Sequence, residues 1–241
     1  MLIYHHINPH AGDTVTVTPE VFAAQMTFLA ESGFSPVSID DLMGALCRGE
    51  KLGNKAVVLT FDDGWVDNYL YAIPVLKRLK FHASFFIITG RVDSSSNGGI
   101  RDFSDIPLHE VAKLCIQSGE SNRVVLDWDL IRNIEKDELF RFYSHTVSHR
   151  RCAGLSGAEL ANELVESKLR LESELGRTCS YLCWPYGSYT DDTIKAAEES
   201  GYTGLFTTDD GFCDPSSDPL RIKRIEVQNS VAWMQELFAT D

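Results

Sequence analysis

The segment KAVVLTFDDGW, residues 55–65, carries the clearest structural signal in the chain. Its continuous apolar run is typical of a strand that is buried on both faces, and the run ends in two adjacent carboxylates, Asp62 and Asp63. Successive strand residues point to opposite faces, so at least one of the two is expected to turn toward the interior or the strand's end. An isolated pair of this kind is more often a polar turn opened by Asp-Asp-Gly.

Short apolar runs alternate with helix-like segments on both sides of this strand, as in repeated βα units around a parallel sheet. Thr18 and Pro19 predict a helix that Gly33 ends, and Ser38 with Asp41 predicts the cap of a second helix. Further helices are expected over residues 69–79, 128–135, 190–201 and 232–238, and a long one from Ser156. Further strands are expected at FSPV (34–37), ASFFII (83–88), LFRFYSH (139–145), YLCW (181–184) and TGLFT (203–207), and RIKRIEV (221–227) leads into the last helix.

These units predict one α/β domain over residues 1–241, a barrel because their number approaches that of a closed ring. The polar, glycine-bearing stretch at residues 91–105 is predicted to be a surface loop or a lid. Working residues in such folds lie at the carboxyl ends of the strands, which is the position of Asp62 and Asp63.

Composition excludes several functions. Of the 241 residues 44% are hydrophobic and 24% are charged, as in an ordinary globular protein. The net charge of -13 disfavours a nucleic-acid partner or an anionic membrane surface, because both attract basic patches. Six cysteines without a CxxC pair favour reduced thiols over a zinc ribbon.

The start MLIYHHINPH shows no signal peptide, and no apolar run is long enough to span a membrane. We therefore expect a cytoplasmic protein, or an exported one if the sequence is a trimmed part of a longer chain. The oligomeric state is not predicted.

Three further segments place reactive side chains after predicted strands. SHTVSH holds His145 and His149, which share one side if the chain turns helically there. Two imidazoles and one carboxylate make a three-ligand zinc site with an open position for water, although a lone pair of this spacing is more often solvated. YHHI brings His5 and His6 to the same end. WPYG, whose tryptophan, proline and tyrosine are also ordinary turn and core residues, follows another strand.

The motifs TFDDG, SHTVSH and WPYG, in this order and each after a strand, resemble those of the NodB-like polysaccharide deacetylases of carbohydrate esterase family four. The start YHHI, the segment FAAQMTFLAESGFSPVSIDDL and the terminal RIKRIEV look most like the poly-N-acetylglucosamine deacetylase branch. The resemblance covers the whole chain and implies a distorted (β/α) barrel of about seven units instead of the regular eight.

Residue by residue, the resemblance implies that Asp63 ligates a divalent metal together with His145 and His149. Zn²⁺ would be the first choice of metal, although Co²⁺, Ni²⁺ or Fe²⁺ suits the same ligands. Asp62 would be the general base on the metal-bound water, and the metal would polarise the acetyl carbonyl.

The third motif implies the oxyanion site. The backbone amide of Tyr186 would help to hold the tetrahedral oxyanion, and Trp184 and Pro185 would shape the wall of the site.

The chain departs from the family pattern at two positions. Cys183 stands where an arginine usually orients the base, so the base must be tuned from elsewhere or more weakly. No histidine follows His149, although a late histidine usually protonates the leaving amine. In the branch with the YHHI start the first-strand histidine is thought to take that role, which makes His5 the candidate acid and His6 the alternative.

The resemblance implies a metal-dependent hydrolase that removes acetyl from an N-acetylated amino sugar, a glycan or a glycan precursor. Polymeric and small or carrier-linked substrates both remain open. A catalytically silent glycan-binding barrel is a second hypothesis, which the retention of Asp62 disfavours because pure metal binding needs no base. An amidohydrolase for a non-sugar C–N bond is a third.

Overall fold

The fold is known from a computed structural model that describes residues 1–99 and 103–239. In these ranges a seven-stranded sheet has the order β10-β9-β8-β7-β6-β1-β11, and every strand pair in it is parallel. The strands are β1 (Leu2–Tyr4), β6 (Leu59–Asp63), β7 (Ala83–Ile87), β8 (Phe140–Ser144), β9 (Tyr181–Cys183), β10 (Gly204–Phe206) and β11 (Ile225–Glu226). The predicted α/β fold of about seven units is confirmed.

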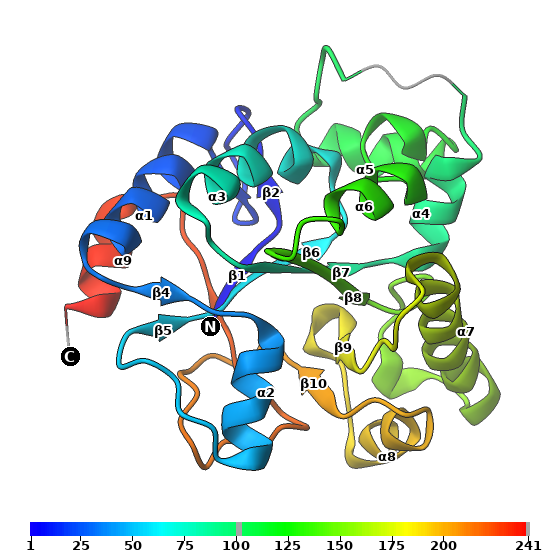
Figure 1. The fold of residues 1–241 in the computed structure, drawn as a ribbon. Helices are drawn as coiled ribbons and strands as arrows, with labels where there is room; N and C mark the ends of the chain where they lie inside the picture. The colour runs from blue at the N-terminus through cyan, green and yellow to red at the C-terminus, as the bar shows by residue number, and fades with distance from the viewer. Residues whose placement is uncertain (100–102, 240–241) are drawn as a thin grey trace.

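The sheet curls into a half barrel with the helices around its outside (Figure 1). Beyond β10 the chain returns along the sheet, where Ile222 pairs in parallel with Phe206 before β11 joins β1. Two short parallel pairs stand apart from the main sheet, namely β2 (His6–Ile7) with β3 (Thr16–Val17) and β4 (Ser35–Pro36) with β5 (Ala56–Val57). The predicted strand FSPV is therefore β4, outside the main sheet.

The helices begin where capping residues predict them. The Thr18 hydroxyl caps α1, and capping boxes at Ser38 with Asp41 and at Ser156 with Glu159 open α2 and α7. The α-helices are α1 (Pro19–Glu31), α2 (Ile39–Arg48), α3 (Ile73–Leu79), α4 (Thr89–Ser96), α5 (His109–Gln117), α6 (Trp128–Ile134), α7 (Gly157–Leu175), α8 (Asp191–Glu199) and α9 (Val231–Phe238). Shorter helical turns are η1 (Asn68–Ala72), η2 (Ser121–Arg123), η3 (Cys152–Gly154) and η4 (Pro185–Gly187). None of the helices in the described residues has the length and apolar character of a membrane span.

An aromatic ladder across four strands sets the register of the sheet. Tyr4, Phe61, Phe85 and Phe142 are direct partners on β1, β6, β7 and β8. Their rings stack with centroid separations of 5.2, 5.0 and 4.9 Å. A slip of one residue would turn each ring to the opposite face, so burial of the ladder holds the register. The carboxylates that follow Phe61 are thereby fixed at the carboxyl edge.

The loop predicted at residues 91–105 is wrong in its first part, because α4 runs from Thr89 to Ser96. Val92 is completely buried in the core. The hydroxyls of Ser94 and Ser96 donate to carbonyl groups one turn back in the helix, and Ser95 donates to the carbonyl of Val125. The polar composition suggested a loop, whereas these serines satisfy their hydroxyls within a helix. Residues 100–102 of the same prediction lie outside the described residues.

Candidate active site

The carboxyl ends of the strands surround a cavity of about 500 Å³. Most of the residues predicted from the motifs line it, namely His5, Asp62, Asp63, His145, His149, Trp184 and Tyr186. Pro185 is buried in η4 between the last two. Segments that are up to 181 positions apart in the sequence therefore meet at one edge of the sheet, as the parallel fold predicts.

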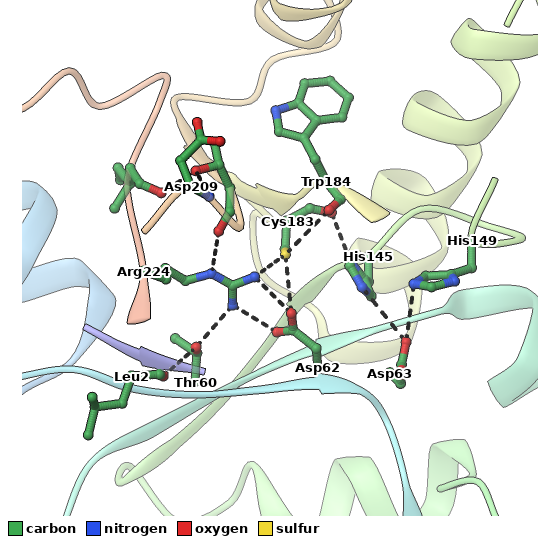
Figure 2. Close-up of polar contacts among 12 residues, drawn as sticks. Leu2, Thr60, Asp62, Asp63, His145, His149, Cys183, Trp184, Asp209 and Arg224 are labelled. Atoms are coloured by element: carbon green, nitrogen blue, oxygen red, sulfur yellow. Dashed lines mark hydrogen bonds and ion pairs between the residues drawn. The ribbon is translucent and has the colours of Figure 1, made fainter. Parts of the chain in front are cut away.

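Asp63, His145 and His149 converge on one point of this cavity (Figure 2). The Nε2 atoms of His149 and His145 lie 3.3 and 3.8 Å from the Oδ1 atom of Asp63. One ligand-type atom from each residue lies within 4.8 Å of the others. Two imidazoles and a carboxylate are the donor set of a three-ligand hydrolytic zinc site.

The chain does not turn helically between His145 and His149, although the sequence analysis needed such a turn to bring both imidazoles to one side. Thr146 and His149 have φ values of 65° and 62°, in the left-handed region. The loop is held by the buried carboxylate of Glu163 on α7, which accepts hydrogen bonds from the backbone amides of Val147 and Ser148 at 2.9 and 2.8 Å. A buried carboxylate that organises backbone amides replaces the helical turn.

Neighbouring groups orient the three side chains and leave their inner atoms free. His145 Nδ1 donates to the carbonyl of Cys183 at 2.8 Å, so its Nε2 faces the cavity unprotonated. Trp65 Nε1 donates to Asp63 Oδ2 at 3.1 Å. Asp63 Oδ1 is buried and has no hydrogen-bond partner among the described residues. An unpaired carboxylate oxygen facing two imidazole nitrogens fits a divalent cation.

The charge states also suit a cation. Burial lowers the pKa of His149 to about 3 and lowers the pKa of His145, so both imidazoles are neutral near pH 7. Burial alone would raise the pKa of Asp63, but the neighbouring histidine side chains outweigh it and the pKa is lowered. Neutral imidazoles and an ionised carboxylate are the forms that bind metal.

Asp62 has a different set of partners, centred on Arg224. The guanidinium donates to Asp62 Oδ1 at 2.9 Å and to Oδ2 at 2.8 Å, and its other donors reach Thr60 Oγ1 at 3.0 Å and the carbonyl of Thr207 at 2.9 Å (Figure 2). Arg224 also contacts the sulfur of Cys183 and is completely buried. Asp62, the predicted base, is therefore oriented by Arg224 next to β11, an arginine that sequence reasoning did not single out.

Arg224 sets the ionisation of this pair. Burial alone would raise the pKa of Asp62, but the charge and hydrogen bonds of Arg224 outweigh it and lower the pKa to about 2. Burial raises the pKa of the Cys183 thiol, which lies 3.5 Å from Asp62 Oδ2 as a neutral donor. Asp62 is thus an ionised acceptor next to the candidate metal ligands.

The two histidines of the first motif have separate environments. His5 lines the cavity, and Asn68 donates to its carbonyl at 2.9 Å. His6 is buried, with Nδ1 2.5 Å from Asp67 Oδ2 and Nε2 3.0 Å from Nδ1 of His109. His109 itself lines the cavity. Sequence reasoning missed Asp67 and His109, since no motif marks a histidine 103 positions from its partner.

The third motif places Tyr186 at the mouth of the cavity. Its φ of 57° lies in the left-handed region, and its ring centroid is 4.5 Å from that of His149. Trp184 is completely buried next to Cys183. A non-glycine residue in this conformation is held by its surroundings and often marks a functional site.

The chain has relatives among known proteins. The family model described as polysaccharide deacetylase matches residues 49–205. The Bacillus subtilis (strain 168) protein YxkH, whose name refers to the same family, is 28% identical over 94% of this chain and 70% of its own length. The poly-beta-1,6-N-acetyl-D-glucosamine N-deacetylase of Escherichia coli (strain K12) is 24% identical over 88% of this chain, and this chain spans 34% of that protein.

Solved structures with the same fold include PplD and IcaB. The Streptococcus pyogenes deacetylase PplD, solved in complex with acetate, has a TM-score of 0.79 and 24% identity over 95% of this chain and 91% of its own. IcaB from Ammonifex degensii has a TM-score of 0.76 and 22% identity over 97% of this chain and 95% of its own. At these identities the similarity shows a common fold.

Proposed function

This chain belongs to the polysaccharide deacetylase family, and on that premise we propose that it is a metal-dependent hydrolase that removes N-acetyl groups from an amino sugar or glycan. The observation that carries the proposal is the contrast between adjacent aspartates. Asp62 is held by Arg224, and Asp63 faces two histidines with an unpaired oxygen. Because β1 and β11 pair across the ends of the chain, we treat residues 1–241 as one catalytic domain.

Asp63, His145 and His149 would hold the metal, because their inner atoms are close together and in the protonation states that bind a cation. Zn²⁺ is the first choice, with Co²⁺, Ni²⁺ or Fe²⁺ as alternatives. When bound, the ion supplies polarisation of the acetyl carbonyl and a lower pKa for water.

Asp62 would act as the general base, taking a proton from the water that attacks the acetyl carbon. Arg224 keeps the carboxylate ionised and fixes both of its oxygens, so the base does not have to be reoriented at the moment of reaction. This support argues against a silent binding protein, since metal binding alone needs no buried arginine beneath the first aspartate.

His5 would donate the proton that the leaving amine requires, so that acetate and a free amine are the products. The position of His5 in the cavity lining supports this role. His6 is engaged by Asp67 and His109, so we assign it a structural role in the site. The backbone amide of Tyr186 would stabilise the developing oxyanion, with Trp184 and Pro185 behind it as the wall.

Acetate release tests the proposal. Chelated protein is assayed with and without added Zn²⁺ or Co²⁺ on N-acetylglucosamine, its oligomers and nucleotide-linked N-acetylglucosamine. We expect acetate only when metal is restored. Metal-independent release would contradict the proposed chemistry, and no release by a protein that binds one metal per chain would favour a non-sugar amide or a binding role.

A further inference from the structure

Two arginines that the proposed reaction does not use flank the candidate metal ligands. On one side, the guanidinium of Arg91 lies 6.0 Å from the ring centre of Trp65, the residue that donates to Asp63. Arg91 and Asp63 line the same cavity. Arg91 stands in the first turn of α4, at the carboxyl end of β7.

On the other side, the guanidinium of Arg151 lies 4.4 Å from the ring centre of Tyr186, and that ring lies 4.5 Å from the ring of His149. Arg151 follows the loop that carries both histidines. Each arginine therefore rests on an aromatic ring that touches a candidate metal ligand, and both arginines line the cavity.

Neither arginine forms an ion pair with a described residue. The neighbouring Arg150 provides the contrast, because it lies outside the cavity lining and pairs with Glu159 at 2.9 Å. A guanidinium that rests on an aromatic face keeps its edge N–H groups available. Those donors match the paired oxygens of a phosphate or a carboxylate.

The charge around the cavity is opposite in sign to that of the chain. The charges of Asp62 and Arg224 cancel, a divalent cation more than balances Asp63, and Glu226 is the remaining carboxylate in the described lining. Arg91 and Arg151 outnumber it, whereas the whole chain has a net charge of -13. A positive cavity in an acidic protein selects an anionic ligand.

We propose that the cavity binds an N-acetylated sugar that carries an anionic group, a phosphate or a carboxylate, with Arg91 and Arg151 as the partners of that group. The inference rests on the proposed function, because it needs the acetyl group at the candidate metal site. The same cations disfavour a polymer that is already partly deacetylated, since each free amine is positively charged. The favoured substrate is thus a small or carrier-linked anionic sugar.

The test compares acetate release by the zinc-loaded protein from N-acetylglucosamine, N-acetylglucosamine 1-phosphate and N-acetylmuramic acid. We expect kcat/KM to favour an anionic sugar over the neutral one, and the favoured sugar separates phosphate from carboxylate. In the double variant Arg91→Gln, Arg151→Gln this ratio should fall by about tenfold or more, because a hydrogen bond to a charged group contributes about 1.5–3 kcal/mol.

Matched variants define the outcomes. Arg150→Gln removes the same charge outside the cavity and should leave the ratio unchanged, whereas Glu226→Gln should raise it. A wild-type protein without anion preference would overturn the inference. A preference that survives in the double variant would also overturn it, because another group of the cavity, such as Lys113 or the metal, would then hold the anion.

A binding measurement separates this inference from the proposed function. Calorimetry with N-acetylglucosamine 1-phosphate and the zinc-loaded protein should show an affinity about tenfold lower in the double variant, with circular dichroism confirming the fold. No acetate from any sugar would count against the proposed function, and the calorimetry would still decide the anion site. Equal affinities would reject the site even if acetate is released.

Discussion

Asp62 and Asp63 are neighbours on one strand, yet their carboxylates have opposite surroundings. Both are buried, with 2% and 9% of their surface exposed. Arg224 hydrogen-bonds to both oxygens of Asp62, whereas Oδ1 of Asp63 has no hydrogen-bond partner among the described residues. A buried charge needs a partner. The first carboxylate receives its cation from the chain, whereas the second would receive one from solution in the proposed metal site.

The divergence has a backbone cause as well as the alternation of a strand. Asp63 has a φ of 75° and Gly64 a φ of 79°, so the chain leaves β6 through two left-handed residues. A Cβ atom on Gly64 would lie 3.1 Å from Cγ2 of Ile87 on the adjacent strand. The positive φ and the close approach of Ile87 together favour glycine at this position.

The largest effect is expected from substituting each aspartate in a separate variant. Asp63→Ala should lose both bound metal and activity, because it removes one of three ligands. Asp62→Asn should keep the metal and lose activity by a factor of about 10²–10⁴, the usual contribution of a general base. Metal content per chain and acetate release measure the two effects.

Because Asp62→Asn also leaves the charge of Arg224 without its partner, its folding is checked by circular dichroism. Equal metal loss in both variants would show that the two roles are wrongly assigned.

A smaller effect, on stability, is expected from Arg224→Gln. The change leaves the charge of Asp62 buried and unpaired, which costs about 3–5 kcal/mol in the free energy of unfolding. Denaturant titration measures it. Asp62→Asn in the Arg224→Gln background should restore part of the loss, because no unpaired charge then remains.

Arg221→Gln is the matched surface control. Arg221 pairs with Asp191 and Asp218 on the surface, and its removal should cost less than about 1 kcal/mol. Similar losses in the two arginine variants would contradict the role given to Arg224.

The smallest effect, on metal affinity, is expected from Trp65→Phe, which changes a hydrogen-bond partner of Asp63. The variant keeps an aromatic ring beside His6 but loses the N–H that orients Asp63 Oδ2. Loss of such a support lowers metal affinity by about 10–100-fold. Competition with a chelator measures the affinity. Trp128→Phe, which removes a hydrogen bond to Asp93 away from the cavity, should leave it unchanged.

The aspartates and histidines could be placed from the sequence because they lie at or after the end of a strand that is visible as a local apolar run. Their geometry could not be derived in the same way. The spacing of His145 and His149 suggested a helical turn, whereas buried Glu163 holds a left-handed loop there. Contacts from a distant helix decide such local conformations, so spacing alone does not reveal them.

Arg224 and His109 could not be predicted from the sequence as residues of the site. Cys183 indicated that some other group must orient the base, but nothing local identifies an arginine 162 positions from Asp62 as its partner. The two meet only because the sheet curls and places β11 beside β1. Likewise His109 meets His6 only through the packing of α5. Long-range partners follow from topology.

The pairing of Asp62 with Arg224 also has a consequence for biosynthesis. Asp62 emerges from the ribosome long before Arg224, because 162 positions separate them. Until Arg224 emerges from the ribosome, a nascent β6 that folded would bury the Asp62 carboxylate without its counter-charge, which is unfavourable. The buried pair can thus form only after residue 224 has left the ribosome. A chain that terminates before residue 224 lacks the cation that pairs with the buried carboxylate of Asp62.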